Sequence, residues 1–322
     1  MPTIDASGYA PPLVLSNGHV HTVYAVFRRQ VGLEHYRRER IDTPDEDFLD
    51  LDWLKNGASR LAVLSHGLEG SSHQAYVLGM ARALTRRGWD VLAWNYRGCS
   101  GSPNRKLGSY HSGATGDLDL VVRHALERHR YRRVALVGFS LGGNLTLKYV
   151  GERGDQLDSR VVSAVAFSVP CDLAGGVKVM ERPSRRIYMV YFLRSLRAKI
   201  RAKMRLQPGE IDDRGFGKLR TFRDFDSRYT APLHGFRDAD DYYRRASSRQ
   251  YLAAIRVRTL LVNAGDDPFL SPSCYPREEA GSNPNFFLEV PPRGGHVGFV
   301  AFNRQREYWS EMRAAAFLDS MS

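Results

Sequence analysis

Short apolar runs alternate with longer segments of helical periodicity along most of the chain. This alternation is typical of a mostly parallel sheet covered by helices on both faces, because consecutive parallel strands need a crossover connection. The predicted strands lie at residues 60–65, 90–94, 133–139, 161–167, 259–263 and 286–290, with antiparallel edge strands near 34–41 and 47–53. The predicted helices lie at 74–87, 116–128, 141–152 and 304–318. We therefore predict an α/β fold.

One long segment interrupts this alternation. Residues 172–246 are basic, aromatic and helical in pattern and contain no clear strand. An insertion that follows the predicted strand 161–167 should lie above the carboxyl ends of the strands, where open α/β sheets hold their sites. We predict a core made of residues 1–171 and 247–322, with residues 172–246 forming a helical lid.

The composition is that of an ordinary globular protein, since 43% of the 322 residues are hydrophobic and 25% are charged. No apolar run approaches the roughly 18 residues needed to span a bilayer, and the first residues lack the layout of a signal peptide. The cysteines Cys99, Cys171 and Cys274 form neither a disulfide framework nor a zinc spacing. We expect a cytoplasmic protein, with peripheral contact at the inner membrane face as an alternative.

The net charge of +12 is concentrated between residues 182 and 223. A local cluster favours one particular surface over a general nucleic-acid-binding coat, so we expect no nucleic-acid partner. Residues 188–205 would form a helix with an apolar face and an adjoining basic face, made of Met189, Phe192, Leu193, Leu196 and Ile200 and of Arg194, Arg197, Arg201 and Arg205. We favour a lid helix whose apolar face packs on the core. The alternative is an amphipathic surface that meets anionic lipid headgroups.

The segment GFSLGG places Ser140 between a predicted strand and a predicted helix. A serine at such a corner has a strained backbone and an exposed hydroxyl, as a nucleophile requires. Gly138 and Gly142 remove side chains that would clash where the strand and the helix approach. The N–H of Leu141 lies at a helix N-terminus and faces any oxygen that gains negative charge. The alternative is an ordinary tight turn, but the context favours Ser140 as a nucleophile.

A serine nucleophile needs a histidine base held by a carboxylate, and in this type of fold they follow the serine in the order acid, then histidine. After Ser140 the chain contains only His234 and His296. We select His296, because it lies in a glycine-rich loop beyond the last predicted strand, and we assign His234 a helix or loop-surface role in the lid. The acid should follow the strand 259–263, where Asp267 is the first choice and Asp266 the second.

A second oxyanion donor is expected in the loop after the first central parallel strand. This loop reads SHGLEGSS, with His66 and Gly67 directly after the strand. We predict the backbone N–H of Leu68 as the donor, and we expect His66 to brace the loop. The alternative is an ordinary glycine turn.

Nine motifs spread over residues 16–300 resemble the α/β-hydrolases of the YheT-like branch, also called α/β-hydrolase family 4. They read SNGHVHT, DFLDLDW, HGLEGSS, NYRGCSGSPNR, YHSG, GFSLGGNLTLKYVGE, HGFRDADDYY, NAGDDPF and GGHVGF. The resemblance implies a serine esterase or lipase without a cofactor, with Ser140, Asp267 and His296 as its triad. His21 stands where glutamine is expected in the N-G-H-x-Q-T segment.

Several other polar residues lie in notable positions, but we predict no catalytic role for them. His19 and His21 have the spacing of two ligands on one strand face, but no third ligand follows, so we expect no metal. Arg97 and His111 lie in a glycine-rich loop beside the expected site, where bracing is the favoured role and substrate contact the alternative. Cys99 has no adjacent base and should be a packed small residue.

These observations predict a serine carboxylic-ester hydrolase that acts through an acyl-enzyme on short- to medium-chain acyl esters or lipids. An acyltransferase that passes the acyl group to an alcohol is one alternative. A non-catalytic lipid- or nucleic-acid-binding protein on a hydrolase scaffold is another. Position 140 is not an aspartate, which counts against enzymes that use a carboxylate nucleophile.

Overall fold

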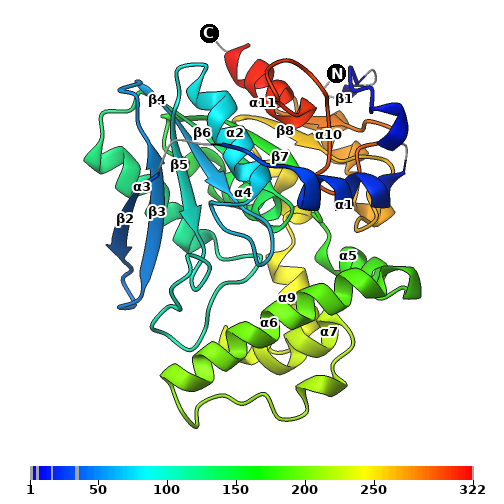
Figure 1. The fold of residues 1–322 in the computed structure, drawn as a ribbon. Coiled ribbons are helices and arrows are strands. Elements are labelled where there is room, and N and C mark those ends of the chain that lie inside the picture. The colour runs from blue at the N-terminus through cyan, green and yellow to red at the C-terminus, as the bar shows by residue number, and fades with distance from the viewer. Residues whose placement is uncertain (1–2, 5–6, 16, 33–35, 321–322) are drawn as a thin grey trace.

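The computed structural model describes residues 3–4, 7–15, 17–32 and 36–320, and this part of the chain forms one nine-stranded sheet between layers of helices (Figure 1). The strands are β1 (Thr3–Ile4), β2 (Arg37–Asp42), β3 (Phe48–Leu54), β4 (Arg60–Ser65), β5 (Asp90–Asn95), β6 (Arg133–Phe139), β7 (Val161–Phe167), β8 (Arg258–Val262) and β9 (Phe286–Glu289). Their order is β1-β9-β8-β7-β6-β4-β5-β3-β2. β3 is antiparallel to both β2 and β5, and the remaining neighbours are parallel. The predicted α/β fold is confirmed.

The strands lie close to their predicted positions. β4, β6 and β7 have the predicted bounds, β5 and β9 differ by one residue at one end, and β8 is shifted by one residue at both ends. β2 is an antiparallel edge strand as predicted, although residues 34 and 35 of that prediction lie outside the described residues. The prediction that β3 is an edge strand was wrong, because β3 pairs with a strand on each side and all seven of its residues are buried.

Eleven α-helices are present in the described residues, several of them a single turn. They are α1 (Gly18–Arg28), α2 (Ala75–Thr85), α3 (Thr115–Arg128), α4 (Leu141–Arg153), α5 (Leu173–Met180), α6 (Arg186–Leu206), α7 (Phe222–Phe225), α8 (Ala231–Leu233), α9 (Ala239–Ala246), α10 (Arg277–Ser282) and α11 (Trp309–Asp319). None of these helices is both long and apolar enough to cross a membrane.

Two helix predictions need correction. The last helix begins at Trp309 and not at residue 304, because Tyr308 and Glu311 form a capping box there and Arg306 has a positive φ of 55°. Such a φ is incompatible with a right-handed helix. Helix α1 was not predicted, although Asn17 marks its start by accepting hydrogen bonds from the N–H groups of His19 and Val20.

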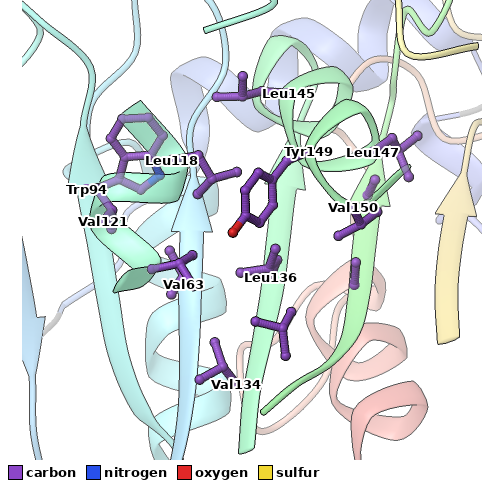
Figure 2. Close-up of a cluster of buried hydrophobic side chains, with 14 of the residues drawn as sticks. Val63, Trp94, Leu118, Val121, Val134, Leu136, Leu145, Leu147, Tyr149 and Val150 are labelled. Atoms are coloured by element: carbon purple, nitrogen blue, oxygen red, sulfur yellow. The ribbon is translucent and has the colours of Figure 1, made fainter. Parts of the chain in front are cut away.

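Both faces of the sheet are buried. Alternate residues of a strand enter separate clusters, so that Leu136 of β6 packs with α3 and α4 while Val137 packs with α2 and α11. Figure 2 shows the first cluster, in which Leu118 of α3 and Tyr149 of α4 lie beside Val63 and Leu136 of the strands. Burial of both faces explains why the central strands are nearly continuous apolar runs.

Helices α5 to α9 follow β7 and precede β8, and the described chain has no strand between them. They gather on one side of the molecule, with α6 spanning it (Figure 1). The apolar face of α6 contains Met189, Leu193 and Leu196, which pack with Phe216 and Tyr229 of the same segment. The apolar face is buried, as expected, but it packs mostly on residues of its own segment and on Phe269, and not on the clusters of the sheet. The division into core and lid at residues 172–246 stays a prediction.

Candidate active site

Ser140 lies at the sharp corner between β6 and α4. Its backbone has φ 52° and ψ −118°, a conformation that is strained for a residue with a side chain. Glycines permit the corner: a Cβ on Gly142 would lie 2.3 Å from the carbonyl oxygen of Ser65, and a Cβ on Gly138 would lie 2.3 Å from that of Gly142. The strand end, the loop after β4 and the helix therefore meet without side chains between them, and Ser140 stands above the sheet.

His296 reaches Ser140 from the loop after β9. Its Nε2 lies 2.8 Å from the Ser140 Oγ. Gly294 and Gly295 have φ values of 154° and 60°, which favour glycine. The His296 N–H donates to the Thr22 hydroxyl of α1 at 2.9 Å, so this helix holds the loop in place. The predicted serine and histidine are thus in hydrogen-bond contact.

Asp267 and not Asp266 contacts the histidine. The Asp267 Oδ2 lies 2.9 Å from the His296 Nδ1, and its side chain is fully buried. Since Nδ1–H donates to this carboxylate, Nε2 is left to accept the Ser140 proton. Asp266 instead accepts the N–H of Gly295 at 2.9 Å, and burial raises the pKa of its carboxyl group. Asp266 therefore braces the histidine loop.

The two predicted oxyanion donors both lie at the cavity that contains the serine. Leu68 and Leu141 line the same cavity as Ser140 and His296. The loop after β4 approaches closely, since a Cβ on Gly67 would lie 3.4 Å from the Ser140 Cβ. Among the described residues, neither the Leu68 N–H nor the Leu141 N–H donates a hydrogen bond within the protein. Both amides are therefore available to an oxygen in the cavity.

His66 braces the loop after β4, as predicted. Its ring is buried, with Nδ1 2.8 Å from the Gly67 carbonyl oxygen and Nε2 accepting the Tyr96 N–H at 3.2 Å. Burial lowers the pKa of His66 to about 3. A neutral ring in this tautomer satisfies both contacts, and it leaves no nitrogen to exchange protons with a substrate.

A cavity of about 160 Å³ opens from Ser140 into the segment α5–α9. Its walls are mostly apolar and include Leu173, Val177, Met180, Phe192, Leu196, Ile200, Phe222, Phe225 and Phe269. Polar groups also reach it, among them His111, Asp226 and His234. Mostly apolar cavities with a few polar groups are typical of sites for small organic ligands.

This chain is similar to known proteins over nearly its whole length. Residues 63–301 match a family model described as "alpha/beta hydrolase fold". The chain belongs to the alpha/beta-hydrolase-fold family. It is 36% identical to the putative esterase YheT of Escherichia coli over 98% of this chain and 94% of that protein. The predicted family and its YheT-like branch are confirmed.

This hydrolase is also similar to two further proteins. It is 32% identical to phospholipase ABHD3 of Mus musculus over 82% of this chain and 66% of that protein. The solved esterase Pf2001 of Pyrococcus furiosus has the same fold, with a TM-score of 0.60 and 18% identity over 91% of this chain and 95% of that one. The predicted class, a hydrolase of ester substrates, agrees with the names of these relatives.

The surface role predicted for His234 was wrong. His234 follows α8 and lines the cavity, with its ring centroid 4.8 Å from that of His111. Burial lowers the pKa of His234 to about 4 and that of His111 to about 3. The residues around it, Pro232 to Phe236, show no periodic burial pattern, and the packing of this turn against Gly108 brings the ring inward.

His19 and His21 lie on helix α1 and not on a strand. Side chains two residues apart on a helix point about 200° apart, so the pair cannot share a ligand. The His19 Nδ1 lies 3.0 Å from the Tyr188 hydroxyl, whereas the His21 Nε2 lies 3.0 Å from the Tyr9 hydroxyl. His21 is fully buried, and a Cβ on Gly295 would lie 2.8 Å from its Cβ. It therefore packs beneath the loop that carries His296.

The glycine-rich loop after β5 holds bracing residues, as favoured. Arg97 donates two hydrogen bonds of 2.8 Å to Asp117 and one of 2.6 Å to Asp45. Burial raises the pKa of Cys99 to about 11, so its thiol stays protonated. Lys199 of α6 contacts the Cys99 Sγ at 3.1 Å, a neighbour that sequence reasoning missed because the two residues are 100 positions apart.

Proposed function

We propose that the protein is a serine carboxylic-ester hydrolase in which Ser140, His296 and Asp267 form the catalytic triad. The observation that carries this proposal is the unbroken chain of contacts from the Ser140 Oγ to the His296 Nε2 at 2.8 Å and from the His296 Nδ1 to the Asp267 Oδ2 at 2.9 Å. The relatives named as esterase and phospholipase support it.

The reaction proceeds in two steps. The His296 Nε2 takes the proton of Ser140 while the Oγ attacks the carbonyl carbon of the ester. Asp267 stabilises the imidazolium that forms. The tetrahedral intermediate collapses when His296 protonates the leaving alcohol, and Ser140 carries the acyl group. Water then attacks the acyl-enzyme with the same base, and Ser140 is released with a carboxylic acid.

The negative charge on the carbonyl oxygen is held by the N–H groups of Leu68 and Leu141. Both line the cavity at Ser140, and Leu141 is the first residue of α4. The N-terminus of a helix carries partial positive charge, which strengthens this donor. Donors of this kind stabilise the transition state more than the ester, because the oxygen becomes charged only there.

The substrates are acyl esters or lipids whose acyl chain enters the apolar cavity under the lid. Residues 172–246 act as this lid, because most of the apolar lining comes from α5, α6 and α7. We expect activity to increase with chain length from acetate until the chain fills the cavity. A panel of p-nitrophenyl esters of increasing length measures this dependence.

Replacement of the nucleophile tests the proposal. Ser140→Ala should lower kcat for p-nitrophenyl butyrate by several orders of magnitude and abolish labelling by a fluorophosphonate. Ser163→Ala is the matched control, because it removes a buried hydroxyl of β7 that bonds the Arg258 carbonyl oxygen and lies outside the cavity lining. The proposal fails if folded Ser140→Ala keeps the normal rate. Product analysis in water–ethanol mixtures distinguishes hydrolysis from acyl transfer to an alcohol.

We also propose that the basic lid meets anionic lipid. Arg197 and Arg201 share Asp213, which reduces their share in such a surface. Arg186 and Arg194 are exposed and have no ion pair with a described residue. Between them on the same helix, the apolar side chains of Ile187 and Val190 are 84% and 59% exposed. Cationic and apolar groups side by side suit a charged lipid surface.

Vesicle sedimentation tests this contact. Arg186→Glu with Arg194→Glu should weaken binding to vesicles that contain phosphatidylglycerol, and should leave cleavage of p-nitrophenyl acetate unchanged. Ile187→Ser with Val190→Ser should weaken binding as well, because apolar burial contributes separately from charge. Equal binding by the wild type and both double variants would refute the lipid contact, and so would the absence of binding by the wild type.

A further inference from the structure

Lys199 is a charged residue on the inner side of α6. Its side chain is 14% exposed, although Arg194 and Arg201 of the same helix are exposed to solvent. The Nζ lies 2.7 Å from the Glu69 Oε1 and 3.1 Å from the Cys99 Sγ, and 4.4 Å from the centre of the Tyr110 ring. A residue of the predicted lid thus contacts the loops that follow β4 and β5.

Glu69 directly follows Leu68, the proposed oxyanion donor. Its backbone has a φ of 53°, a conformation that side-chain-bearing residues seldom adopt. The Glu69 N–H donates to the Tyr110 hydroxyl at 2.8 Å, and that hydroxyl donates to the Glu69 Oε1 at 2.7 Å. The Gly70 N–H closes the turn on the Gly67 carbonyl oxygen at 3.1 Å. The orientation of the Leu68 N–H therefore depends on how Glu69 is held.

The carboxylate of Glu69 is more enclosed than its partner, with 9% of its side chain exposed. A buried carboxylate that loses its cation is left with an uncompensated charge, and the local structure rearranges to expose it to water. Lys199 and Tyr110 bind the same oxygen atom of Glu69. Loss of Lys199 should therefore disturb the turn and not only the helix.

We propose that Lys199 is a positioning residue that, through Glu69, holds the Leu68 N–H in place for the oxyanion. The proposal rests on the triad mechanism above, and it adds that the docking of α6 determines the order of the oxyanion donor. The oxyanion donor is fully ordered only while α6 is docked on the loop after β4. Closure of the lid and completion of the oxyanion hole are then one event.

Lys203 provides a matched control on the next turn of the same helix. It is 2% exposed, and its Nζ donates to the Oδ1 and the backbone oxygen of Asn104, as well as to the Lys106 carbonyl oxygen. It has no ion pair with Glu69. Lys203→Met therefore loosens α6 without touching the turn that carries Leu68.

Kinetics with p-nitrophenyl acetate separate the two roles, because this short ester does not depend on the acyl cavity. Lys199→Met should lower kcat by about tenfold to a hundredfold, while KM changes less than about threefold. This loss in kcat is smaller than the loss expected when an oxyanion donor is removed altogether, because the Leu68 N–H is displaced and not deleted. Lys203→Met should lower kcat no more than about threefold and raise KM chiefly for long-chain esters. Affinity for a trifluoromethyl ketone, which forms the charged tetrahedral adduct, should fall with Lys199→Met in proportion to kcat/KM.

Two further variants keep the test decisive if Lys199→Met proves unstable. Glu69→Gln removes the buried charge from the other side and should lower kcat similarly. In the double variant Lys199→Met with Glu69→Gln, the losses should not add, since both changes break one contact. Unchanged kcat in folded Lys199→Met or Glu69→Gln overturns the proposal, and so does an equal loss in Lys203→Met. Full activity of Ser140→Ala would instead overturn the triad mechanism, so the two failures are distinguishable.

Discussion

The sheet and the segment α5–α9 are built in different ways. In the sheet, alternate residues of each central strand enter two large clusters, and side chains such as Leu136 and Val137 are at most 1% exposed. The segment α5–α9 has smaller clusters formed mostly by its own residues. Helix α6 is tied to the rest of the molecule by polar contacts, such as the Lys199–Glu69 pair and the Lys203 Nζ donating to the Asn104 carbonyl oxygen at 2.8 Å, and by ring contacts with Phe269.

This difference separates two requirements of an enzyme. Ser140, His296 and Asp267 all follow strands of the sheet, so their geometry inherits the rigidity of the close-packed core. The apolar walls of the cavity come mostly from the other region. Hydrogen bonds and ion pairs can break and reform without exposing a large apolar surface, so such contacts are compatible with the proposed role of residues 172–246 as a lid.

Cavity-creating variants should show the largest contrast between the two regions. Leu136→Ala empties a fully enclosed position in β6 and should lower the free energy of unfolding by about 2–5 kcal/mol. Leu196→Ala in α6 borders an existing cavity and should cost less than about 2 kcal/mol. Urea denaturation measures both, and hydrogen exchange should show faster exchange in α6 alone for Leu196→Ala. Equal losses would mean that the two regions unfold as one unit.

Glycine replacements give a contrast of intermediate size. A Cβ at position 142 would lie 2.3 Å and 2.4 Å from the carbonyl oxygens of Ser65 and His66, whereas a Cβ at position 217 meets nothing within 4 Å. Gly142→Ala should destabilise the protein by about 3 kcal/mol through overpacking and should also reduce activity, while Gly217→Ala should change neither appreciably. Thermal melts and esterase assays test the pair. A stable and active Gly142→Ala protein would contradict the tight corner.

The smallest expected effect is a pH dependence in the segment α5–α9. Burial raises the pKa of Asp226 to about 6, and its carboxyl group accepts hydrogen bonds from Tyr243 at 2.7 Å and Thr230 at 2.6 Å. The Asp226 carboxyl group therefore stays protonated to a higher pH in the native state than in the unfolded state, where its pKa has the ordinary value of 3.8. Stability relative to Asp226→Asn should therefore fall by about 1 kcal/mol between pH 5 and pH 7. Urea denaturation at both pH values measures the difference, and a constant difference would show that Asp226 is already ionised.

Much of the fold could be predicted from local sequence patterns. The bounds of β4, β6 and β7 follow from apolar runs that each begin at or directly after an arginine. The contact between Ser140 and His296 could be anticipated because β6 and β9 are strands of one sheet and their carboxyl ends share an edge. Helix α1 was missed because its exposed apolar residues obscure the amphipathic pattern, although its cap, Asn17, was visible.

Contacts between distant segments could not be anticipated in the same way. The position of His234 on the cavity wall depends on how the turn after α8 packs against Gly108. The choice of Asp267 over Asp266 depends on which of two adjacent carboxylates faces the histidine after the loops are formed. Neither feature has a periodicity or a turn signal.

The sequence by itself determined the alternation of strands and helices, the glycine-permitted corner at Ser140 and the order of serine, acid and histidine, because these depend on residues close together in the chain or on strand succession. Only the tertiary structure decided that Lys199 meets Glu69, 130 positions away, and that the apolar face of α6 packs within its own segment. Such pairings depend on the free energy of burying particular charges and apolar surfaces together, which is settled when the elements pack.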